Sequence, residues 1–266
     1  MKVLLVIPAR FASVRYPGKP LVMLKGATGQ KKPLIERSWE AAQAVPGIAR
    51  VVVATDDQRI AAAAQGFGAE VVMTPSSCAN GTERCAAAHD ALGAGYDIVV
   101  NLQGDAPLTP PWFVTALIDE LAKDTEAGMA TPVLACDGAM LAGLLADRSA
   151  GRVGGTTAVF GAGKRALYFS REVIPHLARP FAPDEPTPVF HHVGVYAYRA
   201  AVLAQYHGWP VGPLERSEGL EQLRFLEQGC AVCCVEVDAH GHPFWELNNP
   251  EDLPKIESLL AETGKK

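Results

Sequence analysis

Several features that would assign a function at once are missing from this 266-residue sequence. Neither G-x-G-x-x-G nor G-x-x-x-x-G-K-[ST] occurs, so the two common glycine-rich phosphate-binding motifs are absent. No run approaches the ~18 apolar residues that a membrane span needs, and the short apolar start lacks the pattern of a signal peptide. The six cysteines have no disulfide-framework spacing. We therefore expect a cytoplasmic protein with reduced thiols and no membrane partner.

The excess of negative over positive charge is also small, but the charged residues are unevenly distributed along the chain. The net charge of −5 argues against nucleic acid as a partner. Residues 1–40 nevertheless hold eight of the 24 Lys and Arg side chains and only two acidic ones, Glu36 and Glu40. A basic region at the start of an otherwise acidic chain is typical of a site for an anionic ligand.

Hydrophobic patterning predicts the fold class. Through residue 134, short apolar runs rich in β-branched residues alternate with helical patterns, which is typical of an α/β protein with a parallel, doubly wound sheet. Beyond residue 134 the alternation ends. The expected strands are 3–7, 50–55, 70–73, 97–102 and 128–134, followed by a hairpin (156–160 and 165–169) and strand 231–237. The expected helices lie near 33–46, 60–66, 82–92, 111–122, 217–228 and 250–262.

Two charged segments follow expected strands. Arg10, Arg15 and Lys19 lie on a loop after the first strand, where open α/β sheets bind ligands, and spaced cations suit a polyphosphate. Asp105 follows Gln103 and Gly104 at the carboxyl end of strand 97–102, and a carboxylate there suits Mg²⁺. Each has a simpler alternative: a solvated surface loop for the cations, and a cap of helix 111–122 for Asp105.

Eight blocks spread over nearly the whole chain carry a more specific signal. In order, they closely resemble the signature segments of the 3-deoxy-manno-octulosonate cytidylyltransferases, the CMP-Kdo synthetases. They begin with P-A-R-F-A-S-V-R-Y-P-G-K-P-L and include N-L-Q-G-D and P-L-E-R-S-E-G-L-E-Q-L-R. The blocks cover residues 8–21, 52–57, 80–84, 101–105, 166–171, 192–199, 213–224 and 249–253.

The resemblance implies a Rossmann-like, GT-A-like nucleotidyltransferase fold with a mostly parallel central sheet flanked by helices and a smaller dimerisation and acceptor subregion. It implies a single domain over 1–266, with a CTP-binding half at 1–134 and a dimerisation and acceptor elaboration at 135–200. The implied reaction transfers CMP from CTP to an acidic 3-deoxy-keto sugar, releases pyrophosphate, requires Mg²⁺ and serves lipopolysaccharide biosynthesis. A homodimer is implied as well.

The resemblance also assigns roles to individual residues. Catalysis falls to Arg10, Arg15, Lys19 and Asp105, and the metal to Asp105. The implied nucleotide contacts are Pro8, Ala9, Arg10, Ser13, Arg15, Lys19, Asn80, Gly81, Thr82 and Gln103. The implied acceptor contacts are Arg171, His192, Tyr196, Glu221 and Gln222.

This sequence departs from the family pattern at the second metal ligand. Asn248 stands where the family has an aspartate, and an amide is a weaker Mg²⁺ ligand; Glu246 is a substitute if residues 245–249 form a strand. Ala106 replaces the usual glutamate, and no lysine occurs near Thr156 and Thr157. The acceptor therefore stays open among Kdo, a sialic-acid-like keto acid and a small phosphonate, and a catalytically weak CTP-binding protein is the alternative of another class.

Several of these side chains also have a purely structural interpretation. His192 alternates along an expected strand and suits a core position. Glu221 and Gln222 would lie on the solvated face of an amphipathic helix, and Glu215 and Glu218 are assigned to solvated positions as well. Cysteines 230, 233 and 234 suit a buried strand, with a zinc site formed with His240 and His242 as the alternative.

Overall fold

The computed structural model describes residues 1–12, 16–93, 95–152, 155–242 and 245–265. The chain divides into two compact units, each of which is assembled from separate segments. Unit 1 comprises Met1–Thr115, Tyr198–Ala204 and Ala239–Lys266, and unit 2 comprises Ala116–Ala197 and Gln205–Asp238. Helix α4 (Pro111–Lys123) and strand β11 (Val195–Arg199) are divided between the two units.

Unit 1 is built on a parallel sheet with strand β1 (Val3–Ala9) inside it. Its neighbours are β4 (Arg50–Thr55) and β6 (Ile98–Leu102), and β5 (Glu70–Met73) lies beyond β4; all three pairings are parallel. Every residue of β1 is buried, which explains its continuous apolar run, because a central parallel strand is covered on both faces.

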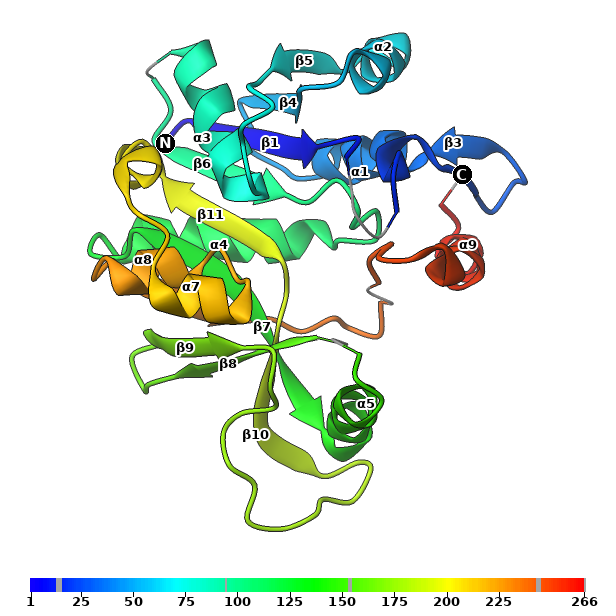
Figure 1. The fold of residues 1–266 in the computed structure, drawn as a ribbon. Coiled ribbons are helices and arrows are strands. Elements are labelled where there is room, and N and C mark those ends of the chain that lie inside the picture. Colours follow the sequence, from blue (N-terminus) through cyan, green and yellow to red (C-terminus); the bar gives the residue numbers. More distant parts are fainter. Residues whose placement is uncertain (13–15, 94, 153–154, 243–244, 266) are drawn as a thin grey trace. The chain divides into compact units, whose positions relative to one another are not determined.

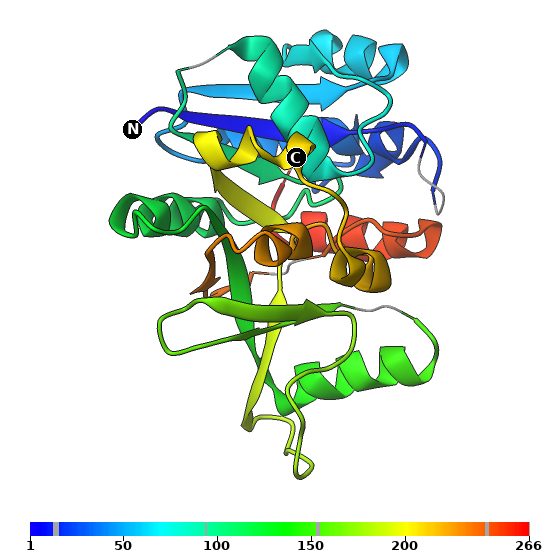
Figure 2. The ribbon, with the colours of Figure 1, turned by 60° about the vertical axis from the view of Figure 1, so that its left-hand side comes forward.

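The helices of unit 1 connect these strands and fix the position of the loops. The chain passes from β1 through β4 to β5 by α1 (Leu34–Gln43) and α2 (Gln58–Gly66), then returns across the sheet to β6 by α3 (Gly81–Leu92). Since such crossovers are right-handed, α3 covers the face opposite to α1, as Figures 1 and 2 show. The order of connection reverses between β1 and β6, the position at which α/β sheets bind ligands.

Shorter elements complete unit 1. Strands β2 and β3 form a separate antiparallel hairpin, and the last helix packs its apolar side chains against Leu24 and Leu34. These elements are η1 (Lys19–Leu21), β2 (Met23–Lys25), β3 (Lys31–Pro33), α6 (Ala200–Leu203), η3 (Pro250–Asp252) and α9 (Leu253–Glu262).

Unit 2 is built on a mixed sheet. Its strand order is β12-β7-β10-β8-β9, in which β12 and β7 are parallel and the other pairs antiparallel. Figure 1 shows α5 beside β7 and β10. The elements are β7 (Met129–Asp137), α5 (Gly138–Ser149), β8 (Thr156–Phe160), β9 (Ala166–Ser170), β10 (Pro186–His192), η2 (Tyr206–Gly208), α7 (Pro213–Glu218), α8 (Leu223–Glu227) and β12 (Val232–Glu236).

The expected α/β fold with its mostly parallel sheet is confirmed, and the differences have physical causes. The helix expected over 217–228 is interrupted, because Gly219 has a φ of +63° and ends α7. Helix α5 was not expected, since Gly138 and Gly143 are weak helix formers; it is capped by Asp137, which accepts the Met140 amide at 2.8 Å. In the described part of the chain, no helix has the length and apolar character to cross a membrane.

Candidate active site

Lys19 is held at the end of the loop that follows β1. Gly18 has a φ of +70°, a conformation that favours glycine, and its amide donates to the Phe11 carbonyl at 2.9 Å. A side chain at Gly18 would meet the Phe11 ring at 3.1 Å. The hydrogen bond from Gly18 to Phe11 therefore joins the two ends of the loop. Because η1 begins at the next residue, the backbone of Lys19 has a defined position.

Lys19 meets Asp105, as the sequence predicted for the two loops. Its Nζ lies 2.5 Å from Asp105 Oδ2, and both side chains are largely shielded from solvent, at 12% and 25% exposed. The Asp105 loop is pressed against β1, because a Cβ at Gly104 would lie 2.9 Å from the Pro8 carbonyl oxygen. Among the described residues, the side-chain partner of the Asp105 carboxylate is Lys19 and not an amide of helix α4.

The start of α3 lies against the same loop. Asn80 caps the helix by accepting the Glu83 amide at 2.8 Å. A Cβ at Gly81 would lie 3.0 Å from the Gln103 amide nitrogen, so the absence of a side chain there lets Gln103 approach the helix. Arg10, which is exposed, donates to the Ala79 carbonyl at 3.2 Å. Three predicted nucleotide segments therefore converge.

Five of the predicted nucleotide residues are either buried or outside the described part of the chain. Thr82 is 1% exposed and its hydroxyl lies 2.8 Å from the Tyr198 hydroxyl, so this side chain is engaged in the interior. Pro8 and Ala9 are buried residues of β1, which leaves mainly their backbone for a ligand. The predicted positions Ser13 and Arg15 lie outside the described residues.

The segment predicted to supply a second metal ligand also reaches Asp105. The Leu247 amide donates to the Asp105 carbonyl oxygen at 2.9 Å, and the Asn248 amide donates to Asp252 at 2.9 Å. Residues 245–248 do not form a strand, so the alternation argument that placed Glu246 beside Asn248 has no support. Asn248 and Glu246 are both partly buried next to the carboxylate loop.

Arg171 of unit 2 follows β9 and lies against the turn after α7. Its Nη2 donates to the Gly219 carbonyl at 3.0 Å, and a Cβ at Gly219 would lie 3.0 Å from Nη2. Among the described residues, no carboxylate forms an ion pair with this guanidinium. The Arg171 Nε is buried and lacks a hydrogen-bond partner in the described part of the chain.

His192 and Tyr196 form an aromatic wall within unit 2. The rings of His192 and Tyr196 lie 5.6 Å apart, and Phe169 packs edge-on to His192 at 5.1 Å. His192 Nε2 lies 2.9 Å from the Thr131 hydroxyl. Burial, with a smaller effect from His191, lowers the pKa of His192 to about 3. The imidazole is therefore neutral near pH 7, as the core interpretation of this histidine requires.

Gln222 lies beside this wall, in the turn between α7 and α8 and not on a helix face. Its Oε1 lies 3.5 Å from the Tyr196 hydroxyl, and the residue is 2% exposed. Its Nε2 is buried and has no partner among the described residues. Glu221 precedes it and is partly buried, with its carbonyl accepting the Tyr206 hydroxyl at 3.2 Å. The solvated-face interpretation is wrong for Gln222.

That interpretation also fails for Glu215 and Glu218. Glu215 is 7% exposed and forms a two-point ion pair with Arg224, at 2.6 and 2.7 Å. Glu218 accepts hydrogen bonds from the Ser170 hydroxyl and the Arg171 amide. Gly219 was the available signal, since a glycine after a helical pattern marks the end of the helix and changes which residues share its face.

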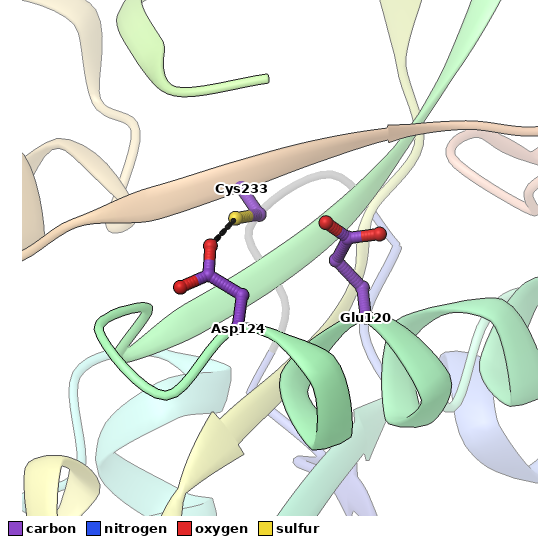
Figure 3. Close-up of side chains that lie close together, drawn as sticks. All are labelled: Glu120, Asp124 and Cys233. Atoms are coloured by element: carbon purple, nitrogen blue, oxygen red, sulfur yellow. Dashed lines mark hydrogen bonds between the residues drawn. The ribbon is translucent and has the colours of Figure 1, made fainter. Parts of the chain in front are cut away.

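The zinc alternative has no support in the described residues. There, the only group with metal-ligand spacing comprises Glu120, Asp124 and Cys233, with no histidine (Figure 3). Arg165 forms an ion pair with Asp124 and lies 2.6 Å from the Cys233 sulfur, while Lys164 Nζ lies 3.0 Å from Glu120. Because protein cations neutralise these carboxylates, the cluster is a salt-bridge network. Burial and Asp124 raise the pKa of the Cys233 thiol to about 11.

A basic loop and a carboxylate at the switch point of a parallel sheet are typical of an α/β protein that binds an anionic ligand such as a nucleotide. Comparison with known proteins narrows the class: the family model described as cytidylyltransferase matches residues 4–236. The 3-deoxy-manno-octulosonate cytidylyltransferase of Maricaulis maris is 44% identical over 265 residues, covering 100% of this chain and 99% of the relative. The mitochondrial enzyme of that name from Arabidopsis thaliana is 38% identical over 97% of this chain and 82% of its own length.

Solved structures agree. The chain is similar to a CMP:2-keto-3-deoxy-manno-octonic acid synthetase complexed with CTP, with a TM-score of 0.82, 35% identity and coverage of 99% and 100% of the two chains. A 4-diphosphocytidyl-2C-methyl-D-erythritol synthase from Anaerococcus prevotii shares the fold, with a TM-score of 0.60, 12% identity and coverage of 97% and 96%. The chain belongs to the cytidylyltransferase family, and is thus a nucleotidyltransferase, as its eight sequence blocks predicted.

Proposed function

We propose that this chain transfers the cytidylyl group of CTP to 3-deoxy-manno-octulosonate, forming CMP-Kdo and pyrophosphate. The relatives at 44% and 38% identity, which match over 99% and 82% of their own lengths, are named 3-deoxy-manno-octulosonate cytidylyltransferases, and the structural neighbour at 35% identity was determined with CTP bound. An acceptor hydroxyl displaces pyrophosphate from the α-phosphorus, so the protein mainly positions the reactants and neutralises charge.

Unit 1 supplies the CTP-binding part of this proposal. Lys19, Arg10 and Arg15 are assigned to the triphosphate and the departing pyrophosphate, since charge-assisted hydrogen bonds to phosphate are stronger than neutral ones. Gln103 and the turn at residues 80–82 are assigned to the nucleoside, along with Ser13 and the backbone of Pro8 and Ala9. The contact between Lys19 and Asp105 supports this assignment, because it joins the two loops on which the triphosphate site depends.

Mg²⁺ is the proposed cofactor. Asp105 would hold it, with Asn248 or Glu246 from the segment whose Leu247 amide bonds to the Asp105 carbonyl. These residues offer oxygen atoms, the ligands that Mg²⁺ prefers, and one or two protein ligands suffice when phosphate oxygens complete the shell. When bound, the ion would neutralise phosphate charge.

Unit 2 supplies the acceptor side, and one observation carries that part of the proposal. Two buried nitrogen donors from the predicted acceptor set, Arg171 Nε and Gln222 Nε2, have no partner among the described residues. Buried donors without partners are rare and costly in proteins. A sugar acid answers both needs, because its carboxylate suits a guanidinium and its hydroxyls suit an amide; His192, Tyr196 and Glu221 would read further hydroxyls.

The direct test measures pyrophosphate release from CTP, Mg²⁺ and single candidate acceptors. The proposal expects release with Kdo that exceeds release with N-acetylneuraminate or phosphonoformate at least tenfold. Preference for one of the other two acids would retain the cytidylyltransferase and replace the acceptor. Tight CTP binding by calorimetry without product from any acceptor would instead favour the catalytically weak CTP-binding protein.

Residues 1–134 are proposed to form the CTP-binding half of the chain. A homodimer is also proposed, in which residues 135–200 form the contact between subunits. The support for the dimer is that this region interrupts the βα alternation and carries exposed apolar side chains, such as Leu145 at 43% and Leu167 at 65%. Sedimentation velocity at micromolar concentration should give twice the 28.2 kDa chain mass. A monomer under these conditions would contradict the proposal.

A further inference from the structure

Glu218 uses its carboxylate to hold the strand end that carries Arg171. Its Oε1 accepts the Ser170 hydroxyl at 2.7 Å and the Tyr168 hydroxyl at 3.3 Å, and its Oε2 accepts the Arg171 backbone amide at 2.8 Å. The Ser170 hydroxyl in turn accepts the Glu172 amide at 3.0 Å. Burial and the nearby Glu218 raise the pKa of Tyr168, so its hydroxyl remains a donor to this carboxylate.

The next residue along the chain holds the other end of Arg171. Gly219 accepts Nη2 at 3.0 Å through its carbonyl, and its lack of a side chain lets the guanidinium lie along its backbone. Two successive residues therefore fix the arginine at its amide and at its guanidinium. The Glu218 oxygens are bonded to an amide and to hydroxyls, not to the guanidinium, so the Arg171 Nε remains available for a ligand.

We infer that Glu218 is the positioning residue for Arg171 and thereby sets the affinity for the acidic acceptor, without touching that acceptor itself. This inference rests on the proposed function for its effect on catalysis. Its structural content does not, because the contacts from β9 to the turn after α7 are independent of which acid binds.

The kinetic test compares Glu218→Ala with Glu218→Gln. Glu218→Ala should raise the KM for Kdo about tenfold or more, since a misplaced binding group can cost up to a hundredfold, and should leave the KM for CTP within twofold. Glu218→Gln should restore most of the loss, because its carbonyl can accept the Arg171 amide while the two hydroxyls turn to accept from its NH₂. Glu236→Ala, an exposed carboxylate of the same unit, is the matched control.

A double-mutant cycle separates positioning from general damage. In an Arg171→Ala background, Glu218→Ala should change the KM for Kdo less than twofold, since residues that act through one another are not additive. Equal increases in the KM values for CTP and Kdo, or full additivity in the cycle, would overturn the inference. Product formation by the wild type with an unchanged Kdo KM in Glu218→Ala would also overturn it while leaving the proposed function intact.

A second readout does not require activity. The Arg171 Nε signal in ¹⁵N NMR spectra can be assigned by its loss in Arg171→Ala. In the wild type and in Glu218→Gln, this signal should be sharp and should lie away from the position of solvent-exposed arginines. In Glu218→Ala it should move toward the position of solvent-exposed arginines. An unmoved signal would contradict the inference, whereas a wild type that makes no CMP-Kdo would contradict only the proposed function.

Discussion

Lys19 and Asp105 are the oppositely charged side chains that join the loops after β1 and β6. At 2.5 Å and largely shielded from solvent, they attract each other more strongly than an exposed pair does. A triphosphate that enters this position offers Lys19 a second set of anionic oxygens. Under the proposed function, Lys19 therefore exchanges part of its contact with Asp105 for contact with phosphate.

Removing Lys19 tests this exchange. Lys19→Ala should lower kcat/KM for CTP roughly a hundredfold, corresponding to about 3 kcal/mol of lost transition-state stabilisation. Steady-state pyrophosphate release measures it. Lys25→Ala removes an equal charge from an exposed position on β2 and should change the rate less than twofold. Equal losses in the two variants would indicate that only the general basic charge matters.

His192 makes a prediction about pH and stability. Burial lowers the pKa of His192 to about 3 and that of His191 to about 4, below the ordinary 6.5. Below pH 6.5 the unfolded chain gains protons that the folded chain excludes, so the free energy of unfolding should fall as the pH drops, by at most about 1.4 kcal/mol per pH unit for each histidine. Above pH 6.5 these histidines contribute no pH dependence.

Urea unfolding of the wild type and of His192→Gln at pH 7 and pH 5 measures this effect. The variant should lose less stability between these two pH values than the wild type does. Parallel losses would show that His192 becomes protonated in the folded protein and would contradict the buried, neutral imidazole.

The pairing of elements explains why the loops of unit 1 meet. Strands β1 and β6 are neighbours, and their parallel direction brings both following loops to one edge of the sheet. Gly104 allows the closest approach, since a Cβ there would lie 2.9 Å from the Pro8 carbonyl oxygen, an atom of the backbone that cannot turn away.

Gly104→Ala should therefore displace the Asp105 loop. We expect a stability loss of about 1–3 kcal/mol, as for other overpacked sites, together with a larger fall in kcat than in CTP affinity. Thermal unfolding and pyrophosphate release measure the two effects. Gly66→Ala, at the end of α2 with no atom within 4 Å of the new carbon, should retain full activity. An active, stable Gly104→Ala would contradict the close approach.

Most of the strands and helices were predictable from the sequence, and the main exception is the interruption of the helix expected over residues 217–228. The β1–β6 half could be predicted because buried parallel strands are continuous apolar runs. The break at Gly219 was not predicted, since the apolar pattern of residues 217–228 continues across it. Consequently Glu215 and Glu218 were assigned to a solvated face, which was also the structural alternative for Gln222. In the structure Glu215 pairs with Arg224, Glu218 bonds to the end of β9, and Gln222 lies against Tyr196.

For the molecule as a whole, the chain matches the Maricaulis maris relative over its full length, and Asn248 stands where the family pattern leads us to expect an aspartate. If Asp105 is the only side chain that binds Mg²⁺ strongly, removal of the ion with EDTA should abolish turnover. When Mg²⁺ is added back, half of the full activity should require a high Mg²⁺ concentration. Asn248→Asp should then lower the half-saturating Mg²⁺ concentration several-fold, because a carboxylate binds this ion better than an amide does. An unchanged Mg²⁺ titration would exclude position 248 from the metal site.

A crystal structure with CTP and Mg²⁺ bound would show whether Lys19 and Asp105 hold the triphosphate and its metal ion. We expect the triphosphate in contact with Lys19 and Arg10 and the ion on Asp105, at the switch point between β1 and β6. A nucleotide bound elsewhere, or a triphosphate that leaves the Lys19–Asp105 contact intact and untouched, would contradict this expectation.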